Sequence, residues 1–315
     1  MNKLSSNRIT RDQGVYFSTP IAARRILIWT AWISTLLLSK LPLVIARELL
    51  GTDIHWIVPA WFGISALLFA ATFVWQSLKP LRAYLIVIGV IYLWTVVDSL
   101  IRGTAVWQNL FAGQPEIIAI FSDRILLVLN TLIVIAALFL IGAKRQDVFL
   151  TFGNLNAPVG GEKTASRRRR LSWSVLGPVT AILLGGLFFA FLLSQTPAGL
   201  SNIPSVLPWL PLIMLSATMN AFGEEVTYRA ATLGTLLPAI GPKHALWMTS
   251  LWFGLGHYYG GFPSGPAGLV QSGLLALLMG KAMLDTRGLG WPWIIHVTID
   301  TAIYTFLALT AVATL

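Results

Sequence analysis

The sequence contains no cysteine, and only four of its 315 residues are histidine. The lack of cysteine excludes disulfides, thiol catalysis and thiolate metal sites. Any metal ion would therefore need histidine and carboxylate ligands, and the chain has few residues of either kind.

Charged residues are also scarce, at 11% of the chain, whereas 56% of the residues are hydrophobic. A soluble globular protein carries about 25% charged residues. So few charges cannot cover a surface that faces water, and most of the exterior is therefore expected to face lipid. The composition predicts a multi-pass protein of the cell membrane.

The formal net charge of +10 raises the question of a nucleic-acid partner. The basic residues, however, cluster beside apolar segments, which is typical of contact with anionic lipid headgroups. We therefore expect membrane lipids as partners and no nucleic acid. The clustered residues are Lys3, Arg8, Arg11, Arg24, Arg25 and the four arginines at 167–170.

Apolar runs of about 20 residues, enough to cross a bilayer, recur from residue 26 to the C-terminus. Backbone groups in hydrocarbon must bond within their own segment, so these runs are helices. The sequence predicts an all-α, polytopic membrane helix bundle of about eight or nine spans. The predicted segments are 26–46, 56–75, 83–101, 125–142, 174–194, 207–233, 243–259, 267–284 and 291–313.

The polar stretch 143–173 divides the chain into two parts. Residues 1–150 form N-terminal membrane helices without a motif, and residues 171–313 form helices with ionisable residues at membrane depth. Such residues are costly in a bilayer and are candidates for a functional site by default. Six of them fall on three predicted spans: Glu224, Glu225, Arg229, His257, His296 and Asp300.

Helical spacing separates the two adjacent glutamates. Glu225 and Arg229 are four residues apart and share a face, where an ion pair is natural. Glu224 points about 100° away from Glu225, on a stripe with Asn220 and Tyr228. We interpret Glu224 as the reactive carboxylate and the pair of Glu225 and Arg229 as its support.

Two further pairs have the same spacing of four residues. His296 and Asp300 converge on one point, as two metal ligands or a base and its orienting group do. Phe253, in a supporting role, and His257 share a face, with two glycines between them to admit a neighbouring helix. Each pair alone is equally consistent with a structural contact, whereas the whole set on separate helices favours a functional site.

In their order along the chain, these residues resemble the three signature motifs of the CPBP family of intramembrane proteases. That family includes the CAAX prenyl endopeptidases and bacterial relatives linked to bacteriocin processing and self-immunity. The resemblance covers roughly residues 170–313, and the N-terminal helices match none of the motifs. The matching residues are Glu224-Glu225-x-x-x-Arg229, Phe253-x-x-x-His257 and His296-x-x-x-Asp300.

The resemblance implies an intramembrane endopeptidase that hydrolyses a peptide bond of a membrane-associated or prenylated protein or peptide. Such a reaction needs an activated water and a stabilised oxyanion. The family's catalytic residues correspond here to Glu224 as general base, His257 as its helper, and His296 and Asp300 on the oxyanion side.

The last motif of the family often ends in asparagine, whereas this chain has Asp300. A neutral amide can donate to an oxyanion, but an ionised carboxylate only accepts. Asp300 is therefore expected to be protonated, to orient His296 or to bind a metal. In a metal version Zn²⁺, the most favoured ion, is held by Glu224, His257 and His296, while a metal-free glutamate mechanism is also consistent with the family.

Two interpretations from other functional classes stay open. A proton-coupled transporter also buries Glu, His and Arg, but it usually has paired broken helices in two related halves. A non-catalytic membrane immunity or scaffold protein has no need to keep Glu224, His257 and His296 together. Assays of the purified protein on peptides separate these interpretations from a peptidase.

Overall fold

The computed structural model describes residues 21–161, 171–194, 199–260 and 263–313. Within these ranges every regular element is a helix, and the one pairing outside the helices is an isolated antiparallel bridge between Pro158 and Ser172. The prediction of an all-α fold is confirmed. Lys3, Arg8, Arg11 and the arginines at 167–170 lie outside the described residues.

Seven helices of the described residues are long and apolar enough to cross a membrane, or eight if one bent pair counts as a span. The bent pair joins α2 (Ile21–Leu37) to α3 (Leu41–Val44) and the π-helix η1 (Ile45–Leu49), with a bend of 50°. These helices confirm the polytopic bundle.

The longest apolar segment, Ile203–Gly260, is interrupted at Gly241. The φ of 79° at this residue lies outside the helical range, and glycine adopts it without steric cost. The next residue, Pro242, has no backbone N–H to continue the helical bonding. The predicted spans 207–233 and 243–259 lie on either side of this interruption.

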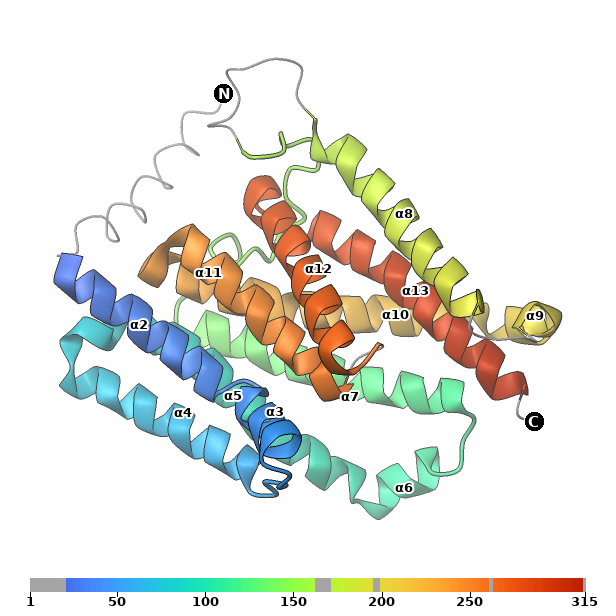
Figure 1. The fold of residues 1–315 in the computed structure, drawn as a ribbon, viewed down its shortest axis with the longest axis horizontal. Coiled ribbons are helices and arrows are strands. Elements are labelled where there is room, and N and C mark those ends of the chain that lie inside the picture. Colours follow the sequence, from blue (N-terminus) through green and yellow to red (C-terminus); the bar gives the residue numbers. More distant parts are fainter. Residues whose placement is uncertain (1–20, 162–170, 195–198, 261–262, 314–315) are drawn as a thin grey trace. The chain divides into compact units, whose positions relative to one another are not determined.

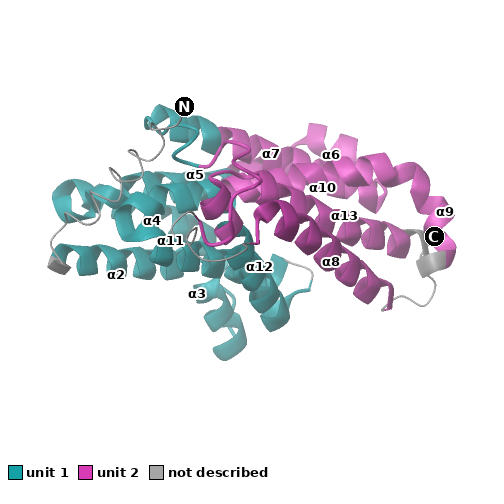
Figure 2. Cartoon of the chain, turned by 90° about the horizontal axis from the view of Figure 1, so that it is seen from above, with its two compact units in different colours: residues 1–96, 134–148, 228–280 teal, residues 97–133, 149–227, 281–315 magenta. Residues whose placement is uncertain are grey.

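The chain forms two compact units that alternate along the sequence (Figure 2). Unit 1 comprises residues 1–96, 134–148 and 228–280, and unit 2 comprises residues 97–133, 149–227 and 281–315. The predicted division into residues 1–150 and 171–313 rests on where the motifs occur, and it stays a prediction. Because each unit contains some of the motif residues, the two are described in turn.

Unit 1 contains α2, α4 (Ile57–Val74), the 3₁₀ helix η2 (Gln76–Leu81), most of α5 (Arg82–Arg102), α11 (Ala231–Gly260) and most of α12 (Gly265–Thr286). In it α2 packs against α11 and η2. Two backbone carbonyl groups at the C-terminal end of α2, that of its last residue and that of the residue after it, accept hydrogen bonds from indole N–H groups. Trp61 donates to the carbonyl of Leu37 at 3.0 Å and Trp252 to that of Leu38 at 3.4 Å.

Unit 2 contains α6 (Ala105–Phe111), α7 (Glu116–Leu140) as far as residue 133, α8 (Trp173–Ser194), α9 (Ile203–Val206), α10 (Leu210–Glu224) and α13 (Gly290–Ala313). Helix α13 packs along both α8 and α10 (Figure 1). Glycine allows the close approach to α8, because a Cβ atom at Gly177 would lie 2.3 Å from the ring of Trp291.

Helix α7 begins at Glu116 rather than at residue 125, the predicted start of the span. The charged residues Asp123 and Arg124 interrupt the apolar run in the sequence, but unit 2 supplies partners for both. Arg102 donates to Asp123 at 2.5 Å, and Arg124 donates to Asn220 at 2.6 Å. The predicted start is therefore wrong, because tertiary contacts satisfy the charges within the helix.

Candidate active site

Glu224 and Glu225 lie where α10 is followed by a π-helical turn. Helix α10 ends at Glu224, and the π-helix η6 (Glu225–Ala230) begins at the next residue. Such turns within α-helices occur frequently at functional sites. The side chain of Glu224 is 17% exposed and that of Glu225 is 0% exposed. Glu224 can therefore meet a small molecule, whereas Glu225 depends on a protein partner.

That partner, within unit 2, is His296 of α13. Nδ1 of His296 donates to Oε1 of Glu225 at 2.7 Å, and both residues are buried. The helical spacing predicts Arg229 as the partner of Glu225, and nothing in the sequence signals the bond to His296, which comes from a distant part of the chain. This bond fixes the imidazole ring and leaves its Nε2 for the other carboxylates.

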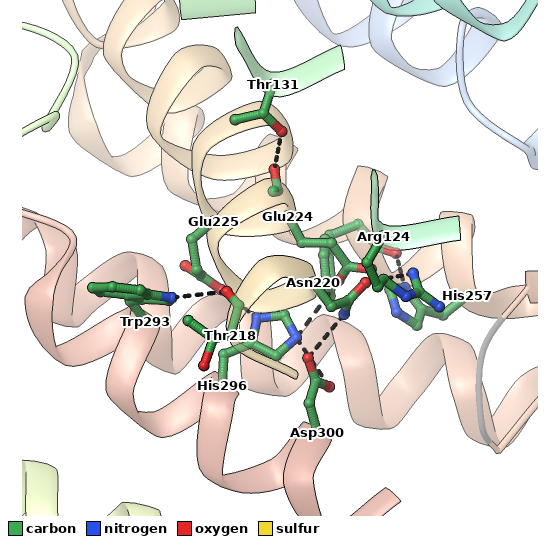
Figure 3. A network of polar contacts seen from close by, with 12 residues as sticks. Arg124, Thr131, Thr218, Asn220, Glu224, Glu225, His257, Trp293, His296 and Asp300 are labelled. Carbon is green, nitrogen blue, oxygen red and sulfur yellow. Dashed lines mark hydrogen bonds and ion pairs between the residues drawn. The ribbon is translucent and has the colours of Figure 1, made fainter. Parts of the chain in front are cut away.

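Nε2 of His296 faces two carboxylates (Figure 3). It lies 3.6 Å from Oε2 of Glu224 and 3.6 Å from Oδ1 of Asp300. These distances are too long for hydrogen bonds, but they are those of ion pairs. Because both ring nitrogens face carboxylate oxygens, the arrangement suits an imidazolium, which donates from both nitrogens. Three carboxylates thus surround one histidine.

Two residues without a predicted role complete this network (Figure 3). Nδ2 of Asn220 donates to Oδ2 of Asp300 at 2.8 Å, and Nη1 of Arg124 donates to Oδ1 of Asn220 at 2.6 Å. Arg124 lies one residue before the predicted start of its span and is therefore absent from the predicted site, although a cation in an apolar run is itself a signal. The signal for Asn220 is its position one turn before Glu224.

Packing between helices of unit 2 holds α10 in place. Nε1 of Trp293 on α13 donates to the carbonyl of Thr218 on α10 at 3.2 Å. On the side of α7, a Cβ atom at Gly223 would lie 2.5 Å from Leu127, so only glycine allows these helices to approach so closely. Glu224, the last residue of α10, is therefore presented by a helix that is tied to two neighbours.

The remaining motif residues contact one another within unit 1. Nδ1 of His257 donates to the carbonyl of Phe253 at 2.9 Å, and the two rings lie 4.4 Å apart. The guanidinium of Arg229 lies 4.9 Å from the centre of the Phe253 ring, within reach of a cation–π interaction. A neutral His257 that donates from Nδ1 has an acceptor at Nε2.

The two glycines between Phe253 and His257 differ in their surroundings. A Cβ atom at Gly254 would lie 2.5 Å from the carbonyl oxygen of Leu269, so α12 approaches α11 closely there, as predicted. Gly256 has nothing within 4 Å of that position, so the predicted close approach is wrong for Gly256.

The structure thus gathers the motif residues into two groups. The convergence of these groups on a single site stays a prediction, as does the ion pair between Glu225 and Arg229. The group in unit 2 consists of Glu224, Glu225, His296 and Asp300, and the group in unit 1 consists of Arg229, Phe253 and His257.

Comparison with protein families identifies the segment that carries these residues. Residues 204–302 match the family model described as "Type II CAAX prenyl endopeptidase Rce1-like", and this range includes all three motifs. The match supports the resemblance of this segment to the CPBP family. The match supports CAAX-protease activity in general, and with the apolar helices it indicates a multi-pass membrane protein that acts on a peptide or protein at the membrane. The comparisons with curated proteins and with solved structures give no match.

A metal ion in this segment would need several converging donors. In the described part of the chain, no group of three or more His, Asp and Glu side chains is arranged to hold one. One nitrogen of His296 is already bonded to Glu225. The side chains as they stand do not fit a metal ion, and the metal requirement stays a prediction.

Proposed function

We propose that this protein is an intramembrane endopeptidase of the cell membrane, with Glu224 as the general base. Its substrate is a membrane-associated or prenylated protein or peptide. The observation that carries the proposal is the group of three carboxylates around His296, of which Glu224 is the most exposed. The match to the CAAX endopeptidase model supports peptide-bond hydrolysis as the reaction.

In the proposed reaction, Glu224 accepts a proton from a water molecule while the water oxygen attacks the carbonyl carbon of the scissile bond. The electron pair of the C=O bond moves to the carbonyl oxygen, which becomes an oxyanion. The Nε2–H of His296 donates to that oxyanion. When the intermediate collapses, the C–N bond breaks and Glu224 passes its proton to the leaving nitrogen, which gives a new carboxyl group and an amine.

The other residues have supporting roles in this proposal. Glu225 holds Nδ1 of His296, so that the opposite nitrogen is the one that meets the substrate. Asp300 adds negative charge beside the same ring and favours its protonated form. The resemblance to the family makes His257 the helper of the general base, and within unit 1 the bond to the carbonyl of Phe253 orients its ring.

Purified full-length protein in lipid nanodiscs tests the proposal. The parent protein is incubated with prenylated and unprenylated peptides, and products are identified by mass spectrometry. We expect Glu224→Gln to lower the cleavage rate at least about 100-fold, because an amide cannot act as a base. Glu116→Gln, which alters an exposed carboxylate at the start of α7, is the matched control and should cleave like the parent.

Two results would count against the proposal in different ways. A fully active Glu224→Gln protein would remove Glu224 from the mechanism. A parent protein that is folded but cleaves none of the peptides would overturn the peptidase activity itself.

A further inference from the structure

We propose that Asn220 is a positioning residue which, held by Arg124, fixes the carboxylate of Asp300 beside His296. The inference rests on the proposed peptidase function and deepens it. It assigns a role to two residues that lie outside the three motifs, one on α10 and one on α7.

The two neighbours of Asn220 determine the direction of its amide. A guanidinium only donates, so Arg124 requires the amide oxygen on its side, where Oδ1 accepts at 2.6 Å. An ionised carboxylate only accepts, so Asp300 requires the amide nitrogen, and Nδ2 donates to it at 2.8 Å. One orientation meets both demands, and the reversed amide would meet neither. The amide is therefore fixed from both ends.

This bond gives the two oxygens of Asp300 separate partners. Oδ2 accepts from Asn220, while Oδ1 faces Nε2 of His296 at 3.6 Å. Asn220 is 5% exposed and Asp300 is 4% exposed, so bulk water cannot replace a partner that is lost. Without the amide, the carboxylate would be free to rotate or to approach His296, and the charge beside the proposed oxyanion donor would change.

The same chain of bonds connects the helices that carry the proposed catalytic groups. Asn220 lies four residues before Glu224, so its amide and the proposed base share a face of α10. Asp300 lies four residues after His296 on α13. Arg124, on α7, lies at the end of this series of hydrogen bonds, and its guanidinium also lies 5.4 Å from the centre of the Tyr304 ring. A change at Asn220 should therefore affect the chemistry on both helices.

An exchange of the two side chains offers a direct test, because it keeps the pairing of amide and carboxylate. In the double variant Asn220→Asp/Asp300→Asn, the guanidinium of Arg124 faces a carboxylate, and the amide at position 300 donates to that carboxylate. In the single variant Asn220→Asp, two carboxylates face each other instead. The double variant should therefore have a higher kcat than this single variant.

The experiment measures kcat, KM and melting temperature for the parent, both single variants and the double variant in nanodiscs. We expect Asn220→Asp to lower kcat by about 10- to 100-fold with little change in KM, as loss of a group that orients a functional side chain does. The kcat of the double variant should be at least about tenfold higher than that of Asn220→Asp. Ser216→Ala is the control: it is buried one turn earlier on α10, and its hydroxyl has no hydrogen-bond partner among the described residues.

Asn220→Ala, which adds no charge, replaces Asn220→Asp if the latter does not fold, and it should show the same loss of kcat. The proposal is overturned if either variant keeps the kcat of the parent, or if the double variant shows the product of the two single losses. A lower melting temperature with unchanged kcat would reveal a purely structural role and overturn it too. If the parent protein cleaves none of the peptides, the proposed function fails. The melting temperatures of the single and double variants then still show whether the side chains at positions 220 and 300 interact, because the effects of interacting residues do not add.

Discussion

Units 1 and 2 each contain some of the residues of the three sequence motifs, but in different surroundings. In unit 2 the polar side chains pair across helices, and the partners His296 and Glu225 are 71 positions apart in the sequence. In unit 1 the ring of His257 is held by the carbonyl of Phe253, four residues earlier on the same helix. Only folding assembles the first arrangement, whereas a single helix suffices for the second.

The difference has consequences for what each group contributes. The buried charges of unit 2 compensate one another, so the loss of one leaves another without its partner. Loss of His257 leaves no buried charge without a partner in this way, because its hydrogen bond is to a backbone carbonyl of the same helix, α11. Substitution of a charged site residue in unit 2 should therefore change both stability and catalysis, whereas substitution of His257 in unit 1 should change catalysis alone.

The largest effect on stability is expected at Glu225. Glu225→Ala removes the acceptor of a buried hydrogen bond from His296, and breaking a buried ionic pair costs about 3–5 kcal/mol. Thermal unfolding of the purified variant measures this loss. The control is Glu224→Ala, which removes a partly exposed carboxylate 3.6 Å from the same ring and should cost about 1 kcal/mol or less. Equal losses for both variants would show that the two glutamates do not differ in the way proposed.

His257→Ala tests whether unit 1 contributes to catalysis. We expect the cleavage rate to fall by about 100-fold or more, the usual size for a general acid–base group, while the melting temperature stays near that of the parent. His55→Ala, which alters a side chain that is 88% exposed in the same unit, is the control and should change neither. A fully active His257→Ala protein would confine the catalytic groups to unit 2.

A pair of glycine variants tests the packing within unit 1. Gly254→Ala places a methyl group 2.5 Å from the carbonyl oxygen of Leu269, and such overpacking costs about 1–3 kcal/mol. Gly256→Ala meets open space and should be neutral or slightly stabilising, because alanine favours a helix more than glycine does. Melting temperatures measure both changes. The same shift for the two variants would contradict the close approach of α12 at Gly254.

The smallest effect is expected from chelation. Because no group of three donors is arranged for a metal in the described residues, cleavage should continue after treatment with a chelator. The assay compares treated and untreated parent protein, with added Zn²⁺ as the third condition. A loss of activity that Zn²⁺ restores would establish the metal version.

Much of the helical architecture could be predicted from the sequence. The span 83–101 corresponds to α5 (Arg82–Arg102), and 174–194 corresponds to α8 (Trp173–Ser194). Such agreement is possible because the length of an apolar run and the need to satisfy backbone groups in lipid are local properties. The start of α7 is different, since the partners that make Asp123 and Arg124 acceptable within the helix come from α5 and α10.

The residue types of the candidate site were also visible in the sequence, because ionisable groups in apolar helices are rare and their spacing shows which of them share a face. The spacing also indicated the pairs within one helix, but it did not show which residues pair across helices. Only the packing of α13 along α10 brings His296 to Glu225 and Asp300 to Asn220. The sequence by itself thus determined the helices and the candidate residues, whereas the tertiary structure decided the pairing, because distances between helices depend on how side chains from distant segments pack.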